Sequence, residues 1–144
     1  KSTHPICQLA DKSNQSVRLL GDIQQILDEL KEQGVIISWV SCTDEPRWAN
    51  ECLDLFESKN GSKLASFVDV SKGKQIFKAN KQRHFEKLQK MYPSVSITKC
   101  YFLTMKKKHR NVSAIGVKSI YSPKGITREV YESGIRQWQN SQKN

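Results

Sequence analysis

The sequence predicts an α/β domain in three layers, in which helices cover both faces of a mostly parallel central sheet. Short apolar runs rich in β-branched residues alternate along the chain with amphipathic segments of about ten to fifteen residues, an order typical of parallel β-α-β units. A chain of 144 residues is long enough to bury a core of its own. We therefore expect one domain over residues 1–144, with an irregular segment or a short first strand over 1–15 and the α/β core over 16–139.

The first half of the chain predicts two helices. One is expected over residues 22–33, because four apolar residues recur on one helical face: Ile23, Ile26, Leu27 and Leu30. Gly34 supplies its C-terminal stop. Pro46 opens the second helix, whose apolar residues also recur at helical spacing: Trp48, Cys52, Leu55 and Phe56. We expect Trp48 in this helix, and Trp138 near the end of the chain, to pack between a helix and the sheet.

Three segments of the first half have the composition of strands. Residues 35–42 (VIISWVSC) form a continuous apolar run, which is typical of a strand buried on both faces and places Trp39 in the core. A polar turn follows the second helix at residues 58–63. Residues 65–70 and 74–78 are shorter strand candidates.

The second half predicts a helix, two strands and a final helix. Asn80 can cap the helix, and Pro93 ends it. The inner face of this helix would carry His84, Phe85, Leu88 and Met91. Strands are expected over 98–105 and 117–122, and the loop KKKHRN follows the first of them. An amphipathic helix over 127–139 completes the domain.

The net charge of +10 is distributed unevenly along the chain. Residues 72–110 contain one acid, Glu86, against twelve bases, and so carry a net charge of +11. The twelve bases are Lys72, Lys74, Lys78, Lys81, Arg83, Lys87, Lys90, Lys99, Lys106, Lys107, Lys108 and Arg110. This asymmetry predicts an anionic partner, either an anionic ligand or an acidic protein surface. Nucleic acid is an alternative partner, although the sequence contains no recognisable RNA- or DNA-binding module.

The cysteines and the apolar runs argue against two further classes of protein. The four cysteines are Cys7, Cys42, Cys52 and Cys100. They form no C-x-x-C pair and have no histidine cluster nearby, so we expect no zinc site. Cys42 and Cys100 end apolar runs, where a free thiol acts as a small core residue, and a disulfide is the alternative. The apolar runs are about eight residues long, too short to span a membrane.

A ligand site is expected beyond the carboxyl ends of the parallel strands, where the loops gather. This rule selects Ser41, Cys42 and Thr43 after the first strand and residues 104–110 after the later one. Asn80 and Lys81 start the third helix, where free N–H groups, the helix dipole and a lysine all favour an anion. The predicted anion-binding residues are therefore Ser41, Thr43, Asn80, Lys81, Lys106, Lys107, Lys108 and Arg110.

Four segments of the chain resemble one known family. They read VRLLGDIQQILDELKEQGV, SCTDEPRWANECLDLF, IFKANKQRHFEKL and IGVKSIYSPKGITREVYESGIRQW. In this order and at this spacing, residues 16–139 resemble the magnesium-dependent phosphatase family within the haloacid dehalogenase (HAD) superfamily. In that family the second segment is a strand ending in S-R-T before a helix, and the third is a glycine-serine-lysine turn before a histidine-phenylalanine pair. The resemblance implies a three-layer Rossmann-like HAD fold, and Mg²⁺ as the cofactor of an intact member.

The resemblance also implies which catalytic groups are present. In the superfamily a D-x-D-x-T strand end supplies the nucleophile and the acid-base group, a hydroxyl and a lysine hold the phosphate, and a later acidic pair helps to hold Mg²⁺. Ser41 takes the hydroxyl position and Lys81 the lysine position. Thr104 and Met105 fall at the acidic pair, and Lys106 follows them. The motif D-x-D-x-T occurs nowhere in the 144 residues.

The missing carboxylates determine the functional expectation. In the segment ICQLADKSN, Asp11 is the candidate remnant of the first aspartate and Ser13 takes the place of the second; alternatively, the first strand lies upstream of Lys1. With at most Asp11 as a ligand and several lysines nearby, Mg²⁺ binding is unfavourable, so we expect no metal, no cofactor and no catalytic residue. We expect an inactive phosphatase-like pseudoenzyme that binds an anion. The alternatives are a nucleic-acid binder that uses residues 72–110 and a residual phosphatase with an unorthodox site.

The sequence leaves the compartment and the oligomeric state open. The family resemblance implies the cytoplasm. Three N-x-S/T sequons in predicted loops, at Asn14, Asn60 and Asn111, and the lack of an initiator methionine favour secretion, for instance as an effector, as the alternative.

Overall fold

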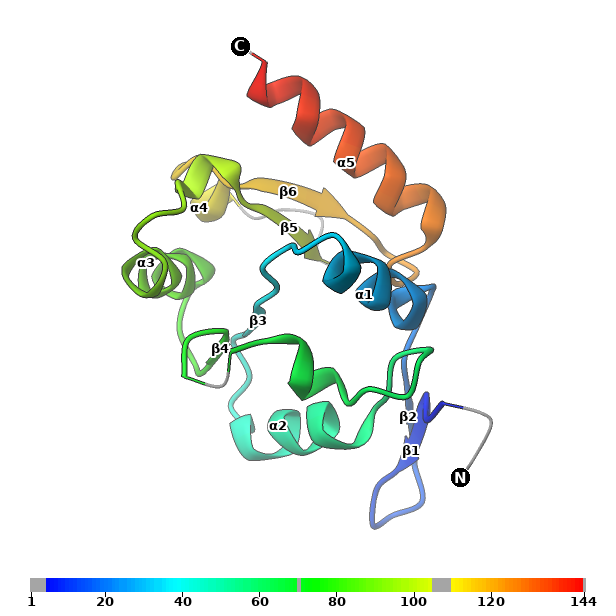
Figure 1. Ribbon diagram of the computed structural model, residues 1–144. Coiled ribbons are helices and arrows are strands. Elements are labelled where there is room, and N and C mark those ends of the chain that lie inside the picture. The colour runs from blue at the N-terminus through cyan, green and yellow to red at the C-terminus, as the bar shows by residue number, and fades with distance from the viewer. Residues whose placement is uncertain (1–4, 70, 105–109, 144) are drawn as a thin grey trace. The chain divides into compact units, whose positions relative to one another are not determined.

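Figure 1 shows the computed structural model of the chain, in which residues 5–69, 71–104 and 110–143 are described, residues 110 and 111 by their backbone alone. The chain divides into two compact units. The first unit contains residues 1–19 and 23–78, and the second contains residues 20–22 and 79–144. Each unit holds one pair of parallel strands, so the α/β class and the parallel pairing predicted from the sequence are confirmed.

The described residues of the first unit, 5–19, 23–69 and 71–78, form two helices, two strand pairs and one short 3-10 helix. In chain order its elements are β1 (Gln8–Ala10), β2 (Ser16–Arg18), α1 (Ile23–Glu32), β3 (Trp39–Ser41), α2 (Pro46–Leu55), η1 (Leu64–Phe67) and β4 (Lys74–Ile76). Strands β3 and β4 are parallel, with Val40 opposite Gln75. The core of this unit consists of Leu27, Phe56, Leu64 and Phe67. Leu27 lies on the predicted inner face of α1, and this helix ends at Glu32, two residues before Gly34, which adopts a positive φ of 71°.

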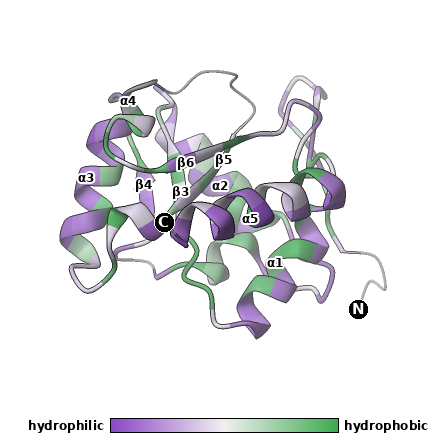
Figure 2. Ribbon diagram, turned by 90° about the horizontal axis from the view of Figure 1, so that it is seen from above, coloured by the Kyte–Doolittle hydropathy of each residue, from purple (hydrophilic) through white to green (hydrophobic). Residues whose placement is uncertain are grey.

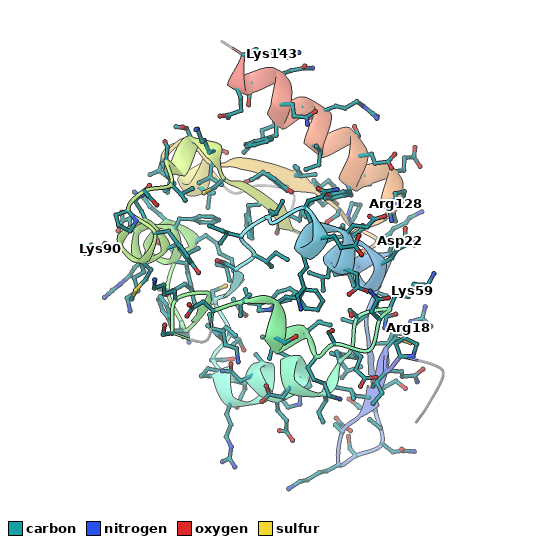
Figure 3. All side chains as sticks on the ribbon, viewed as in Figure 1. Arg18, Asp22, Lys59, Lys90, Arg128 and Lys143 are labelled. Carbon is teal, nitrogen blue, oxygen red and sulfur yellow. The ribbon has the colours of Figure 1, made fainter. Side chains whose placement is uncertain are left out.

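The second unit contains the remaining helices and the second parallel pair. Its elements are α3 (Lys81–Met91), η2 (Ile97–Lys99), β5 (Tyr101–Thr104), α4 (Arg110–Ser113), β6 (Lys118–Tyr121) and α5 (Arg128–Gln142). Strands β5 and β6 run parallel and lie side by side, with Phe102 opposite Ser119 (Figure 1). Phe85, Val112 and Val117 form the core of this unit. A hydrogen bond of 2.7 Å from the N–H of Arg128 to Oδ2 of Asp22 holds the start of α5, and the two residues are neighbours in Figure 3.

Helices cover both faces of the β5–β6 pair. The ring of Phe85 on α3 meets the ring of Phe102 edge-on, with the centroids 5.3 Å apart. Gly134 of α5 approaches Ile120 of β6 so closely that a Cβ at this position would lie 2.4 Å from the Ile120 Cδ1. Because Phe102 and Ile120 point to opposite faces of the pair, α3 and α5 lie on opposite sides of it.

The tryptophans test the predicted packing. The indole N–H of Trp39 donates to the carbonyl of Leu64 at 3.0 Å, and its ring packs against the first core, as predicted. Trp138 on α5 contacts Tyr101 of β5 with ring centroids 5.4 Å apart, so its predicted helix-to-sheet packing is also confirmed. Trp48 is 49% exposed, and its predicted packing against the sheet is wrong.

Two predicted strands are shorter than expected. The run 35–42 is a strand only at β3, and Val35 and Ile36 are 39% and 57% exposed, so burial on both faces is wrong for this part. The run 98–105 is a strand from Tyr101 to Thr104, because its first residues form the 3-10 helix η2. Residue 105 lies outside the described residues.

Two other segments adopt different structures from those predicted. The strand candidate at 65–70 is the 3-10 helix η1, in which Leu64 and Phe67 stand one turn apart and are both buried. Arg110 and Asn111 of the predicted loop KKKHRN begin α4. Met91, expected on the inner face of α3, is 42% exposed.

The short first strand exists, but it does not join a parallel sheet. Strand β1 pairs antiparallel with β2, with Leu9 opposite Val17, and so forms a hairpin. Asn14 in its turn has a positive φ of 65°, a conformation that asparagine tolerates well. The expectation that residues ending at Asp11 provide a first parallel strand is therefore wrong. None of the helices formed by the described residues is long and apolar enough to cross a membrane.

Candidate functional site

Ser41 and Thr43 lie in the turn from the carboxyl end of β3 to the start of α2. The carbonyl of Ser41 accepts the N–H of Phe77 at 3.0 Å, which extends the parallel pairing with β4 to the last residue of β3. Thr43 Oγ1 accepts the N–H of Glu45 at 3.0 Å, one residue before α2 begins. Both residues therefore lie at the strand end selected from the sequence. Cys42 between them is exposed, so its predicted role as a small core residue is wrong.

Asn80 caps α3, as predicted from the sequence. Its Oδ1 accepts the N–H of Arg83 at 3.0 Å, which satisfies one of the N–H groups at the start of the helix. Its carbonyl oxygen lies 2.9 Å from Nδ1 of His84, a side chain with no exposed surface. These two contacts fix the first turn of α3 and with it the position of Lys81.

Lys81, the first residue of α3, is held beside β5. Its Nζ lies 5.6 Å from the centroid of the Phe102 ring, within the range of a cation–π contact. Phe102 and Thr104 lie on the same face of β5, because side chains alternate along a strand, and Thr104 is the last residue of that strand. The second unit thus brings the predicted lysine and the end of β5 to one region. Ser41 and Thr43 belong to the first unit.

The other predicted anion-binding residues follow β5. Lys106, Lys107 and Lys108 lie outside the described residues. Arg110 is the first residue of α4, where only its backbone is described. Sequence reasoning did not identify Phe102 as the residue beside Lys81. The feature of the sequence that could have indicated it is its place in an apolar strand, two residues before Thr104.

Asp11, the candidate remnant of a catalytic aspartate, organises the β1–β2 turn. Its Oδ1 accepts the hydroxyl of Ser13 at 2.7 Å, the N–H of Ser13 at 2.9 Å and the N–H of Gln15 at 2.8 Å. The Ser13 hydroxyl bond, followed by the Gln15 N–H bond, lowers the pKa of the Asp11 carboxyl below its usual value. These contacts are those of a turn-forming aspartate.

The described residues do not fit a magnesium ion. Mg²⁺ needs oxygen ligands that usually include one or two carboxylates. In the first unit the end of β3 carries the hydroxyls of Ser41 and Thr43, and the exposed Asp44 and Glu45 follow in the turn. In the second unit Thr104 ends β5, and Lys81 adds a positive charge beside that strand. Within residues 5–69, 71–104 and 110–143, no three His, Cys, Asp or Glu side chains gather as they would around a metal.

Comparison with known proteins identifies the family. The family described as Acid Phosphatase matches residues 1–141. This chain belongs to that family. Among curated proteins, human magnesium-dependent phosphatase 1 is 26% identical over 132 residues, which cover 92% of this chain and 70% of the human protein. Both findings support the relationship to HAD-like magnesium-dependent phosphatases that the four sequence segments indicate.

Membership of the acid phosphatase family gives Ser41 and Lys81 a chemical context. In the resemblance drawn from the sequence, these residues stand at the positions that hold the phosphate, and the carboxylate positions carry other side chains. Ser41 ends β3, and Lys81 starts α3. The phosphate-holding roles of Ser41 and Lys81 stay predictions.

Proposed function

We propose that this member of the acid phosphatase family is a pseudoenzyme that binds an anionic ligand and does not hydrolyse phosphate esters. The observation that carries the proposal is the environment of the β5 end. The ammonium group of Lys81 lies over the ring of Phe102, and Thr104 follows Phe102 by two residues. By resemblance, the family's metal-binding acids would stand in the stretch that here reads Thr104, Met105 and Lys106. The same proposal includes the three-layer Rossmann-like arrangement in one domain.

Electrostatics supports the loss of turnover. A carboxylate that attacks a dianionic phosphate meets charge repulsion, and a bound metal ion normally offsets it. The 144 residues contain no D-x-D pair, and Asp11 is bonded within a hairpin turn. A phosphate held near Lys81 would therefore lack the aspartate nucleophile that the D-x-D-x-T motif supplies.

Electrostatics also supports anion binding. The N-terminus of an α-helix carries a partial positive charge and directs N–H groups toward a ligand, and a lysine there adds a full charge. Helix α3 has eleven residues, and Lys81 is the first of them. The segment 72–110, which includes α3, holds twelve bases and one acid. Ser41, Thr43, Asn80, Lys106, Lys107, Lys108 and Arg110 stay predicted contributors to the anion site.

A combined activity and binding experiment tests the proposal. Hydrolysis of an aryl phosphate is measured with and without Mg²⁺, and the melting temperature is measured with Mg²⁺ and with inorganic phosphate. We expect no turnover, no shift with Mg²⁺ and a higher melting temperature with phosphate. The phosphate shift should be much smaller in Lys81→Met and persist in Lys90→Met, a matched change at the other end of α3.

Two results would contradict the proposal. Magnesium-dependent turnover that disappears in Asp11→Asn would show an active site built on that carboxylate. Binding of a single-stranded oligonucleotide whose affinity falls steeply with salt, without a phosphate shift, would favour nucleic acid as the partner, because neutralised backbone phosphates release counterions.

A further inference from the structure

Helix α2 presents an unusual surface for a helix at the edge of a core. None of its ten residues is fully buried, and Trp48 and Leu55 are 49% and 42% exposed. The two side chains are seven residues apart, so they lie two turns apart on one face, separated by about 10 Å. Glu51 lies between them on that face and is exposed. Asp44 and Glu45, also exposed, precede the helix; with Trp48, Glu51 and Leu55 they form what we call the α2 stripe.

Helix α3 presents a surface of the opposite charge. Arg83, Lys87 and Lys90 are exposed and recur at helical spacing, so they share one face, and the exposed Glu86 lies on that face between Arg83 and Lys90. The opposite face buries His84 and Phe85, which fixes the orientation of the helix. We call the three bases the α3 stripe. Figure 2 shows α3 as largely hydrophilic, and Figure 3 labels Lys90 at its exposed end.

The two stripes match in length and in chemistry. Trp48 and Leu55 are seven residues apart, and so are Arg83 and Lys90, so the helical part of the α2 stripe and the α3 stripe are each about 10 Å long. The α2 stripe carries three acids, and the α3 stripe carries three bases. An exposed indole attracts arginine and lysine through a cation–π contact, which pairs Trp48 with the α3 stripe as well.

We propose that the α2 stripe of one molecule docks on the α3 stripe of a second copy of this chain. The contact joins two different surfaces, so it is heterologous: a pair of molecules leaves one α2 stripe and one α3 stripe without a docked copy, and further copies can extend the assembly or close it into a ring. A contact between two short helices buries little area, so the association is weak, with a dissociation constant on the order of 0.1 mM. This inference is independent of the anion site, because Lys81 does not belong to the α3 stripe.

The net charge sets the conditions of the experiment. Two molecules of charge +10 repel each other at long range. At about 150 mM salt the Debye length is about 8 Å, so this repulsion is largely screened while charges in direct contact still attract. We therefore expect association at about 150 mM salt that weakens at about 500 mM.

Sedimentation equilibrium of charge-reversed variants tests the pairing. Glu51→Lys and Lys87→Glu each place like charges opposite one another, so each alone should associate at least about tenfold more weakly than the wild type. A mixture of the two variants should associate again, because the base introduced on the α2 stripe of one molecule then faces the acid introduced on the α3 stripe of the other. Glu132→Lys and Lys118→Glu are matched controls at exposed positions outside both stripes and should associate like the wild type. Circular dichroism establishes that every variant is folded.

Three outcomes would overturn the proposal. One is a wild-type protein that stays monomeric at all concentrations up to about 0.5 mM, which is above the expected dissociation constant. Another is association of the single variants equal to that of the wild type. The third is a folded mixture that associates no better than its two components, since that result would leave the two stripes without mutual recognition.

Discussion

The ammonium group of Lys81 lies over the ring of Phe102, with Nζ 5.6 Å from the ring centroid. Phe85, one turn further along α3, meets the same ring edge-on at 5.3 Å. Phe102 of β5 therefore packs against the first turn of α3 and positions the side chain of Lys81. The geometry makes Phe102 a positioning residue for the proposed anion site, because its ring acts on a ligand through Lys81.

Replacing Phe102 should weaken both the fold and the proposed site. Phe102→Leu removes the cation–π contact and the edge contact, so we expect a loss of about 1 kcal/mol in unfolding free energy and about threefold weaker phosphate binding. Urea unfolding and calorimetric titration with phosphate measure the two effects. The double variant Lys81→Met/Phe102→Leu should bind phosphate no more weakly than Lys81→Met alone. Additive losses would mean that Phe102 acts on the ligand by another route.

Substitutions of Asn80 should distinguish the effect of the helix cap on stability from the effect of charge on phosphate binding. Asn80→Ala removes the acceptor of the Arg83 N–H and should cost about 1 kcal/mol of stability. Asn80→Asp keeps a capping oxygen, so we expect near wild-type stability. Its negative charge next to Lys81 should nevertheless weaken phosphate binding, as measured by the shift in melting temperature.

A second cap provides the control for Asn80. Thr127 Oγ1 accepts the N–H of Val130 at 3.3 Å at the start of α5. Thr127→Ala should destabilise the protein to a similar degree and leave phosphate binding unchanged. Unchanged phosphate binding in Asn80→Asp would show that the start of α3 does not belong to the phosphate site.

Local signals in the sequence predicted the helices and their caps well. The spacing of Ile26, Leu27 and Leu30 defines α1, and Asn80 marks the start of α3, because both signals depend on residues within one or two turns. The placement of Lys81 at the start of α3 follows from the same cap. The contact of Lys81 with the Phe102 ring depends on tertiary packing between residues 21 positions apart, which no local pattern specifies.

Strands were predicted less well, because their limits depend on pairing partners. The run 35–42 is apolar throughout, yet pairing with β4 extends only over Trp39–Ser41. The β1–β2 hairpin carries a turn signal in Asp11 and Asn14, yet the resemblance favours the reading of Asp11 as a remnant of a catalytic strand end. The exposure of Trp48 was missed because helical spacing indicates that a face is apolar and not what covers it.

Gly134 should tolerate no side chain as long as Ile120 is present. A Cβ on Gly134 would lie 2.4 Å from Cδ1 of Ile120, so Gly134→Ala should force β6 and α5 apart. We expect a net loss of about 1–3 kcal/mol in unfolding free energy, although alanine favours a helix more than glycine does. Adding Ile120→Val removes Cδ1 and should recover part of the loss, as measured by urea unfolding. An equal loss in the single and double variants would contradict this account.

The hydrogen bonds that Asp11 accepts should change the acid titration of its carboxyl group. The Ser13 hydroxyl is the main cause of the lowered pKa of Asp11, and the Gln15 N–H is the next. A carboxyl whose pKa is lower in the folded state contributes stability above its unfolded pKa, and this contribution is lost as the pH falls through the folded pKa. Ser13→Ala removes the main cause, so the pKa of Asp11 should rise toward the ordinary aspartate value of about 3.9.

An NMR titration of the Asp11 carboxyl carbon from about pH 6 to pH 2 measures this change directly, because the window includes the ordinary pKa of aspartate and the range below it. Ser16→Ala is the matched control, since the Ser16 hydroxyl accepts a bond from Gln8 and makes none to Asp11. The wild type and Ser16→Ala should titrate below Ser13→Ala. Identical titration of all three would mean that Asp11 does not organise the hairpin turn in solution, and the carboxyl would then again be a candidate for the chemistry that its turn contacts argue against.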